Sequence, residues 1–283
     1  MMNADEMELY LVEKGVSSEH IQVLKNEIVQ GMDSDLQECF EYVETVERLI
    51  PVDKIVSLPR FRRGRDGTWW DHFNCQAGSI VEVRIESLRR SMEQKGLESF
   101  IHSFSLPKYK VRGCYYPRLD QYYIEQDGTH RTLWAKVVDA PYIYARVEIY
   151  KLVKEKYRNY LMLLSLKESW YELLRKCHLS WHYDNNMVMY GDKEVFKFYR
   201  PPSFSGDDVS TQIIKEKYKR NIGIFEKCLH LDRYWKKRIR NRELRYKIIK
   251  NIVCPFIELR DKGYVDSAAY RLLISLYESD WEL

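Results

Sequence analysis

The sequence contains no CxxC pair, and its six cysteines are spread from Cys39 to Cys254. Such spacing lacks the framework of a small secreted disulfide-bonded domain and indicates free thiols in a reducing compartment. No apolar run approaches the roughly 18 residues of a membrane-spanning helix. The first fifteen residues are acidic and lack the apolar segment of a signal peptide. We therefore expect a cytoplasmic protein without a membrane partner.

Several common catalytic and cofactor motifs are also missing from the sequence. It contains no Walker loop, GxGxxG fingerprint, HExxH helix, nucleophile elbow of a serine hydrolase or zinc-knuckle spacing. Internal repeats are absent as well. Cys177, His178 and His182 could approach a metal ion if they shared one helix face, but no fourth ligand is evident beside them. A metal at these three residues is the weaker interpretation, and the end of a helix is the stronger one.

The composition is that of an ordinary globular protein. The chain has 283 residues, of which 45% are hydrophobic and 31% are charged, and 22 are tyrosines. This length suits one large domain or two modest ones. The net charge of +4 is too small to require a nucleic-acid partner by itself.

Periodicity predicts a mixed α+β chain. Residues 17–48 have the spacing of two helices, capped by Ser17 or Ser18 and by Asp33 or Ser34. Helices are also predicted at 79–95, which ends at Gly96, and at about 129–138. Strands are predicted at 50–56, 100–106, 121–126 and 142–149, and a hairpin is predicted with arms 187–190 and 195–199.

The run from Tyr122 to Ala135 is the most informative stretch. A strand is followed by Asp127-Gly128 as a break, and Thr129 can cap a helix that begins with His130 and Arg131. The free N–H groups of a helix start, together with a guanidinium, favour a bound phosphate. The alternative is that His130 and Arg131 simply pair with acidic neighbours.

Four sequence boxes, in order, resemble the ParB N-terminal/sulfiredoxin-like superfamily. They are Ile50–Ile55 as the opening strand, Leu88–Leu97 as a helix with a glycine stop, Asp127–Arg131 with Ala135 as the phosphate box, and Pro141–Ala145 as the closing strand. The resemblance covers about a third of the chain. It implies a small mixed-sheet domain with flanking helices. From Lys151 onward the sequence pattern itself is mostly helical. We accordingly divide the chain into an N-terminal helical segment (1–48), a ParB/sulfiredoxin-like domain (49–150) and a basic C-terminal region (151–283).

The resemblance also implies a ligand, a nucleoside tri- or diphosphate with Mg²⁺. Its phosphate contacts would be Gly128, Thr129, His130 and Arg131, with Arg131 as a bidentate fork. Asp127 could coordinate the metal, or it could be only a turn residue. The arginine-rich loop after the first strand would add phosphate or nucleic-acid contacts through Arg60, Arg62 and Arg63.

Departures from the family separate its branches. Sulfiredoxins need a cysteine where this chain has Thr129, and a hydroxyl cannot replace that thiolate. Partitioning CTPases carry Glu-Arg-Arg in place of Thr129-His130-Arg131. Serine kinases place a His-Glu pair where this chain has Leu58-Pro59-Arg60, so Asp66, Asp71 or Glu82 would have to supply the carboxylate.

The clearest charge feature is segment 215–250. It carries fourteen lysines and arginines against four acidic residues, a net charge of +10, which leaves −6 for the rest of the chain. Lys236, Lys237 and Arg238 lie together in this segment and could contact nucleic acid or an acidic protein. The alternative is a set of helices with a solvated basic face.

Three functions follow from these observations. The preferred one is a nucleotide-binding, DNA-associated regulator of phage or mobile-element type. The second is a small-molecule kinase of the serine type that uses ATP or ADP. The third is a protein-interaction module or inhibitor with a vestigial pocket. The base identity, the substrate and the existence of a homo-oligomer stay open.

Overall fold

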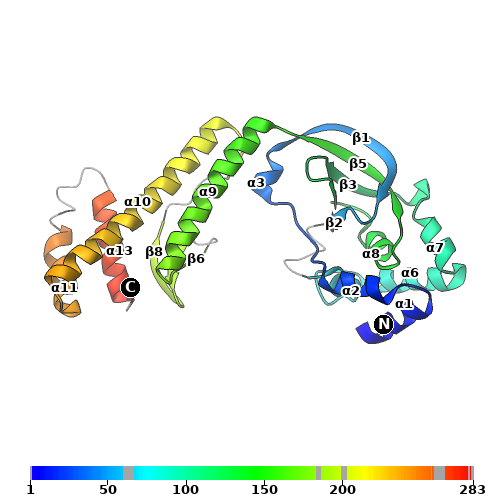
Figure 1. Ribbon diagram of the computed structural model, residues 1–283, viewed down its shortest axis with the longest axis horizontal. Helices are drawn as coiled ribbons and strands as arrows, with labels where there is room; N and C mark the ends of the chain where they lie inside the picture. The colour runs from blue at the N-terminus through cyan, green and yellow to red at the C-terminus, as the bar shows by residue number, and fades with distance from the viewer. Residues whose placement is uncertain are drawn as a thin grey trace. The chain divides into compact units, whose positions relative to one another are not determined.

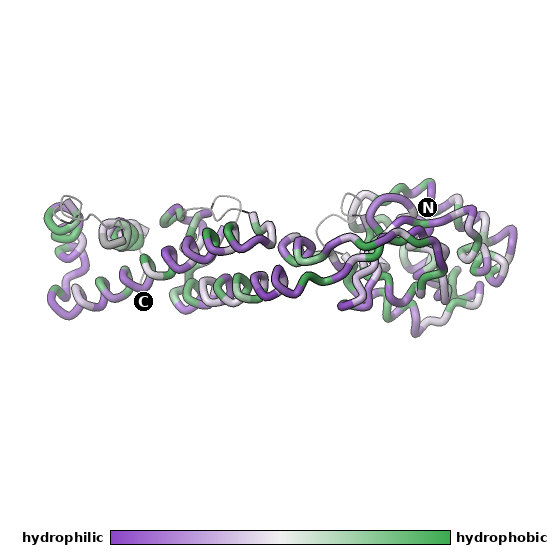
Figure 2. The backbone as a smooth tube through the Cα atoms, turned by 90° about the horizontal axis from the view of Figure 1, so that it is seen from above, coloured by the Kyte–Doolittle hydropathy of each residue, from purple (hydrophilic) through white to green (hydrophobic). Residues whose placement is uncertain are grey.

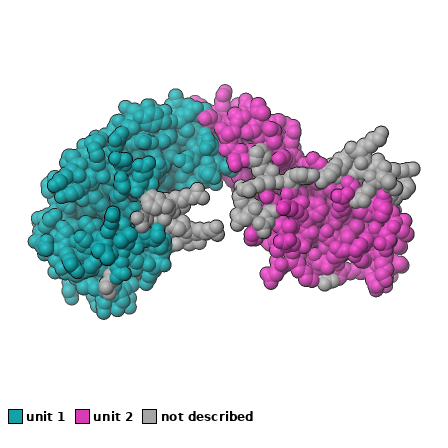
Figure 3. Space-filling view, turned by 180° about the vertical axis from the view of Figure 1, so that it is seen from behind, with its two compact units in different colours: residues 1–153 teal, residues 154–283 magenta. Residues whose placement is uncertain are grey.

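The chain divides into two compact units, residues 1–153 and 154–283 (Figures 1 and 3). This computed structural model describes residues 2–59, 67–182, 186–198, 203–255, 257, 265–279 and 281. Each unit has its own apolar core. The N-terminal helices belong to the first unit.

Three helices precede the sheet of unit 1. Helix α1 (Ala4–Glu13) begins at a capping box in which Asn3 and Glu6 satisfy each other's backbone N–H groups. Helix α2 (Ser18–Asn26) buries Ile21 and Leu24, and the single turn α3 (Ser34–Gln37) is capped by Asp33. The chain then enters β1 through the buried residue Cys39.

Unit 1 contains a five-stranded mixed sheet with the order β1-β5-β3-β4-β2. The strands are β1 (Phe40–Pro51), β2 (Ile55–Ser57), β3 (Val111–Tyr116), β4 (Gln121–Ile124) and β5 (Tyr142–Leu152). The pairs β1–β5 and β3–β4 are antiparallel, whereas β3–β5 and β2–β4 are parallel. Figure 1 shows β1 and β5 curving over the rest of the unit, with α8 (Thr129–Val137) beneath them.

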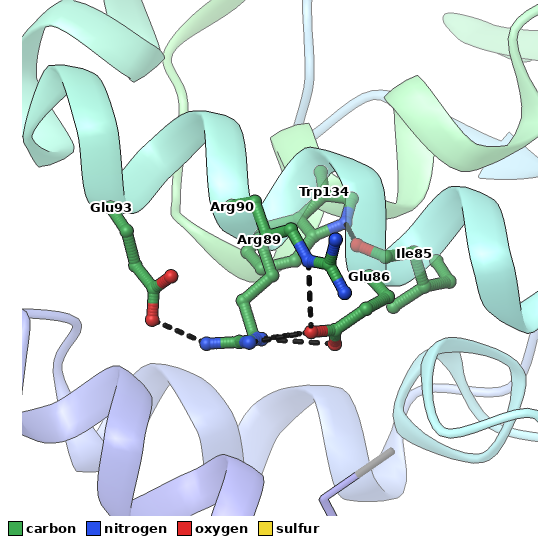
Figure 4. A network of polar contacts seen from close by, with 6 residues as sticks. All are labelled: Ile85, Glu86, Arg89, Arg90, Glu93 and Trp134. Carbon is green, nitrogen blue, oxygen red and sulfur yellow. Dashed lines mark hydrogen bonds and ion pairs between the residues drawn. The ribbon is translucent and has the colours of Figure 1, made fainter.

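Between β2 and β3 the chain forms the helices α5 (Trp69–Phe73), α6 (Glu82–Lys95) and α7 (Leu97–Ser103) and the 3₁₀ turn η1 (Pro107–Tyr109). They pack around α8 through Trp134, whose ring meets Phe73 and Phe100 edge-on at 4.9 and 5.5 Å. The Trp134 indole N–H also donates to the carbonyl of Ile85 on α6, at 3.2 Å (Figure 4). The position of α8 is therefore fixed from several sides.

Ion pairs and a cation–π contact of Arg89 stabilise the side of α6 that faces α1. Arg89 donates to both Glu86 and Glu93 on its own helix (Figure 4). Its guanidinium also lies 5.3 Å from the ring centre of Tyr10, so the same residue joins α6 to α1.

Unit 2 is mainly helical. It comprises α9 (Lys154–Lys176), the hairpin sheet β6 (Ser180–His182), β7 (Met187–Tyr190) and β8 (Lys193–Lys197), the long helix α10 (Asp208–Arg238), α11 (Arg242–Ile248), the π-helical turn η2 (Ile249–Val253) and α13 (Val265–Glu278). Trp170 of α9 is the centre of its core and packs against Phe198 and Phe225 at 5.1 and 5.9 Å. Figure 2 shows hydrophilic and hydrophobic residues alternating along α9 and α10, as expected for helices buried on one side.

The predicted α+β class is confirmed at the level of a mixed fold with a five-stranded mixed sheet. Helices at 79–95 and 129–138, the stop at Gly96 and the strand from Tyr142 are present. The hairpin is also present, but its second arm starts at Lys193, two residues before the predicted one.

Three element predictions are wrong. Residues 40–48 form most of β1, paired with β5, and are not helical. Phe40 is buried whereas Val43 is 49% exposed, so the apolar residues read as one helix face do not share a buried face. The opening strand 50–56 is divided between the end of β1 and β2. Residues 100–106 lie largely in α7 and do not form the predicted strand. The sequence pattern also gives no prediction of β3, the strand that pairs in parallel with β5.

The substitution Gly128→Ala tests how closely the backbone at the start of α8 packs against Val111 of the sheet. Gly128 has φ +103°, and a Cβ there would lie 2.3 Å from a methyl carbon of Val111. We expect a loss of about 2–5 kcal/mol in the free energy of unfolding, from left-handed strain plus overpacking. Gly15→Ala is the matched control: φ is +100° and the nearest atom is 3.6 Å away, so strain alone applies, at about 1–2 kcal/mol. Equal losses in urea titrations would contradict the packing argument.

Candidate functional site

The start of α8 is built on a glycine. Gly128 adopts φ 103°, ψ 7° and is the N-cap residue, and no side chain caps the helix. The predicted N-cap role of Thr129 is therefore wrong: Thr129 is the first helical residue and is 5% exposed. A left-handed residue is needed to turn β4 into α8, and only glycine fits this close to Val111.

His130 joins two helix starts. Its side chain is 8% exposed, and its Nε2 accepts a hydrogen bond from the backbone N–H of Val81, the N-cap of α6, at 3.0 Å. Because that backbone group can only donate, Nε2 carries no proton. The predicted hydrogen bond to a phosphate therefore cannot come from this nitrogen.

Arg131 is turned toward α7 and η1. Its guanidinium donates to the carbonyl of Ser103 and lies 5.0 Å from the ring centre of Phe104 and 4.9 Å from that of Tyr109. Burial lowers the pKa of Arg131 to about 10, which still leaves it cationic near neutral pH. Its guanidinium is thus held by a backbone carbonyl and two aromatic rings, while its Nε is buried without a hydrogen-bond partner. The bidentate fork on a phosphate stays a prediction.

Asp127 is the exposed member of the predicted box. Its side chain faces solvent, and its carbonyl accepts from the N–H of Arg112 at 3.2 Å. Across the described ranges, no group of three or more His, Cys, Asp or Glu side chains could hold a metal ion. The role of Asp127 as a Mg²⁺ ligand stays a prediction.

The other sequence candidates lie in different places. Arg60, Arg62 and Arg63 lie outside the described residues, as does Asp66. The Asp71 carboxylate accepts from the backbone and hydroxyl of Thr68 in a capping box, at 2.9 and 2.8 Å, so it is committed to the start of α5.

The metal interpretation of Cys177, His178 and His182 required one shared helix face. Helix α9 ends at Lys176, His178 has a left-handed φ of 54°, and His182 lies on β6. The three residues therefore do not share a helix face.

Two hollows flank the end of β4. The larger, of about 450 Å³, is lined by the turn before α3, by Ser57 and by residues 123–126, at the carboxyl ends of the parallel strands β2 and β4. The smaller, of about 270 Å³, lies over β3 and β5 and shares Glu125 and Gln126 with the first. Carboxyl ends of parallel strands are a common place for ligands in α/β sheets.

Helix α10 separates its charges from its core. Residues such as Ile214, Phe225 and Cys228 are buried. Six exposed cations lie in a sector of about 140° on the opposite side, at 100° per residue. We call these six the basic face: Lys219, Arg220, Lys227, Arg233, Lys237 and Arg238.

One predicted nucleic-acid contact, Lys236, also serves the fold of unit 2. Lys236 lies 2.9 Å from Asp232, which is 1% exposed and also accepts from the hydroxyl of Tyr277 at 2.7 Å. Arg245 is 4% exposed and donates to the same hydroxyl at 2.8 Å. Lys236 thus balances the buried carboxylate directly, and Arg245 reaches it through the Tyr277 hydroxyl, so that the network links α10, α11 and α13. Only the burial of Asp232 reveals this role, and no sequence pattern signals it.

Arg131→Lys separates a packing role from a phosphate-binding role. Lysine lacks the planar fork that stacks between Phe104 and Tyr109, so we expect the free energy of unfolding to fall by about 1–2 kcal/mol. The control is Arg118→Lys at an exposed position, where no change is expected. Thermal and urea unfolding check both variants, and an unchanged stability for Arg131→Lys would contradict the packing role.

None of the helices in the described part of the chain is long and apolar enough to cross a bilayer. Comparisons with protein-family models, with curated proteins and with solved structures find no match. The resemblance to the ParB/sulfiredoxin-like superfamily thus stays a prediction from the sequence boxes.

Proposed function

We propose that this protein is a nucleic-acid-associated protein whose second unit binds the phosphate backbone through the basic face of α10. The observation that carries this proposal is the segregation of charge on one long helix. Six cations share one exposed side, and between Lys219 and Arg238 the only exposed acidic side chain is Glu226. A helix that merely needed solubility would mix charges of both signs.

The dimensions of the basic face suit a polyanion. Lys219 and Arg238 are separated by about 28 Å along the helix axis, at 1.5 Å per residue. Double-stranded DNA presents one phosphate for roughly each 1.7 Å of its axis, so several phosphates can be contacted together.

An aromatic residue lies within the same face. Tyr234 is 40% exposed, and the guanidinium of Arg238 stacks on its ring at 3.4 Å. This stack holds Arg238 in place and presents a rigid cation with an amphipathic ring beside it.

Removal of three cations tests the proposal. The variant Lys219→Gln/Arg233→Gln/Lys237→Gln changes exposed residues only. We expect its affinity for a DNA duplex to fall at least about tenfold and the slope of log affinity against log salt to decrease by about 3, because three phosphate contacts are lost. Fluorescence anisotropy over a salt series measures both quantities.

The control removes the same number of charges elsewhere. Lys95→Gln/Arg118→Gln/Lys151→Gln alters exposed residues of unit 1 and should leave the slope unchanged. Equal losses in the two triple variants would show a non-specific charge effect and reject the basic face. Binding of polyglutamate as tight as that of DNA would identify an acidic protein as the partner and would also reject the proposal.

A second candidate function is nucleotide binding at the larger hollow. It is favoured by the place of that hollow at the carboxyl ends of β2 and β4, where its lining reaches Gln126, two residues before Gly128. In this version the phosphates contact the backbone around Asp127–Thr129, with Mg²⁺ at Asp127, and the side chain of Arg131 is not required. For the kinase alternative, Asp71 is a poor candidate for the catalytic base, because its carboxylate is bonded to Thr68. For the protein-interaction alternative, we expect no nucleotide to bind.

A thermal-shift series with CTP, ATP, ADP and GTP in the presence of Mg²⁺ tests this candidate. At about 100 times Kd, a ligand stabilises the folded state by about 2.7 kcal/mol, which raises Tm by several degrees. Ser34→Trp, which fills only the larger hollow, should abolish the rise, whereas Arg131→Lys should retain it. Ser18→Trp, at the equivalent first position of α2, is the matched control. A flat response to all four nucleotides would reject nucleotide binding.

A further inference from the structure

Arginines from two neighbouring strands lie side by side on one face of the sheet of unit 1. Arg112 of β3 and Arg146 of β5 are direct partners in the parallel register of these strands. Both are exposed and alternate with buried residues such as Val111 and Val147, so they point away from the face that packs against α8. Like charges in directly opposite positions destabilise a sheet.

The described carboxylates beside this pair form no ion pair with it. Among the described residues, no ion pair or hydrogen bond joins either guanidinium to a carboxylate. Glu47, the register partner of Arg146 on β1, is bonded to Lys110 at 2.5 Å. Glu148 accepts from the hydroxyl of Tyr150 at 3.0 Å. The two guanidinium groups therefore keep their donors available.

The same side chains line the smaller hollow. Its volume is about 270 Å³, and its wall contains Arg112 and Arg146 together with Glu125, Glu148 and the amide of Gln126. Cys114 lies beneath it, 2% exposed, and burial raises the pKa of its thiol, so this group is neutral. The hollow thus presents two cations and, beside them, two carboxylates that accept hydrogen bonds.

We propose that Arg112 and Arg146 together bind the oxyanion group, phosphate or carboxylate, of a small molecule that carries an amino or hydroxyl group beside it. Planar guanidinium forks match both kinds of oxyanion. The adjacent Glu125 and Glu148 accept hydrogen bonds from the second group of the ligand and repel long polyanions. The hollow holds a small molecule and not a nucleic-acid strand, so this site is independent of the basic face of α10.

Matched pairs of small probes test the site by isothermal titration calorimetry. Phosphoethanolamine and ethyl phosphate differ in the amino group, as do β-alanine and propionate. We expect binding at about millimolar concentration, with the amino-bearing member of each pair at least about threefold tighter. The stronger pair identifies phosphate or carboxylate as the natural group.

Two variants give opposite signatures that misfolding cannot imitate. Arg112→Gln/Arg146→Gln should weaken the best probe at least about tenfold and, without any probe, should raise Tm, because the like-charge pair is removed. Glu148→Gln should remove the preference for the amino-bearing probe while the alkyl probe still binds.

Arg118→Gln is the control, and it should bind the probes like the unaltered protein. The proposal is overturned if the unaltered protein binds no probe at about millimolar concentration, or if the double variant binds as tightly as the unaltered protein. A lower Tm of the double variant without any probe would also overturn it, because the two arginines would then stabilise the fold and not a ligand.

Discussion

The burial of α8 against the curved sheet is the constraint on which unit 1 depends. All of its nine residues except Arg131 are buried, and the backbone at Gly128 approaches Val111 too closely for any side chain. The other end is equally enclosed: Lys136 is 4% exposed and lies 3.5 Å from Glu27, and burial lowers the pKa of its amine. Because the sheet, α2, α5 and α6 all contact this one helix, its position determines theirs.

The same burial decides what the polar residues of α8 can do. His130 and Arg131 have the chemistry to bind phosphate, but each is directed to a backbone group or an aromatic ring of a neighbouring element. These contacts occupy Nε2 of His130 and one terminal nitrogen of Arg131, whereas the buried Nε of Arg131 has no hydrogen-bond partner. In unit 2, the buried Asp232 holds Lys236 directly and Arg245 through the hydroxyl of Tyr277.

Both binding sites that we propose therefore rest on exposed charge. The basic face of α10 and the pair Arg112 and Arg146 both lie on exposed surfaces, and both place cations close together. Repulsion between like charges costs stability, and a bound anion relieves it. The two sites differ in shape, since one is a long open helix face and the other a small hollow.

The sequence by itself determined the elements whose signals are local. The helix stop at Gly96, the turn at Gly128 and the long amphipathic helices follow from backbone conformation and periodicity, which a short segment carries within itself. Tertiary structure alone decided that residues 40–48 form an edge strand, because apolar spacing in a short run fits either a helix or a strand until its partner β5 is known. It also decided that Arg131 faces Tyr109 and that Arg112 meets Arg146, because strand register and burial bring together residues that are far apart in the chain.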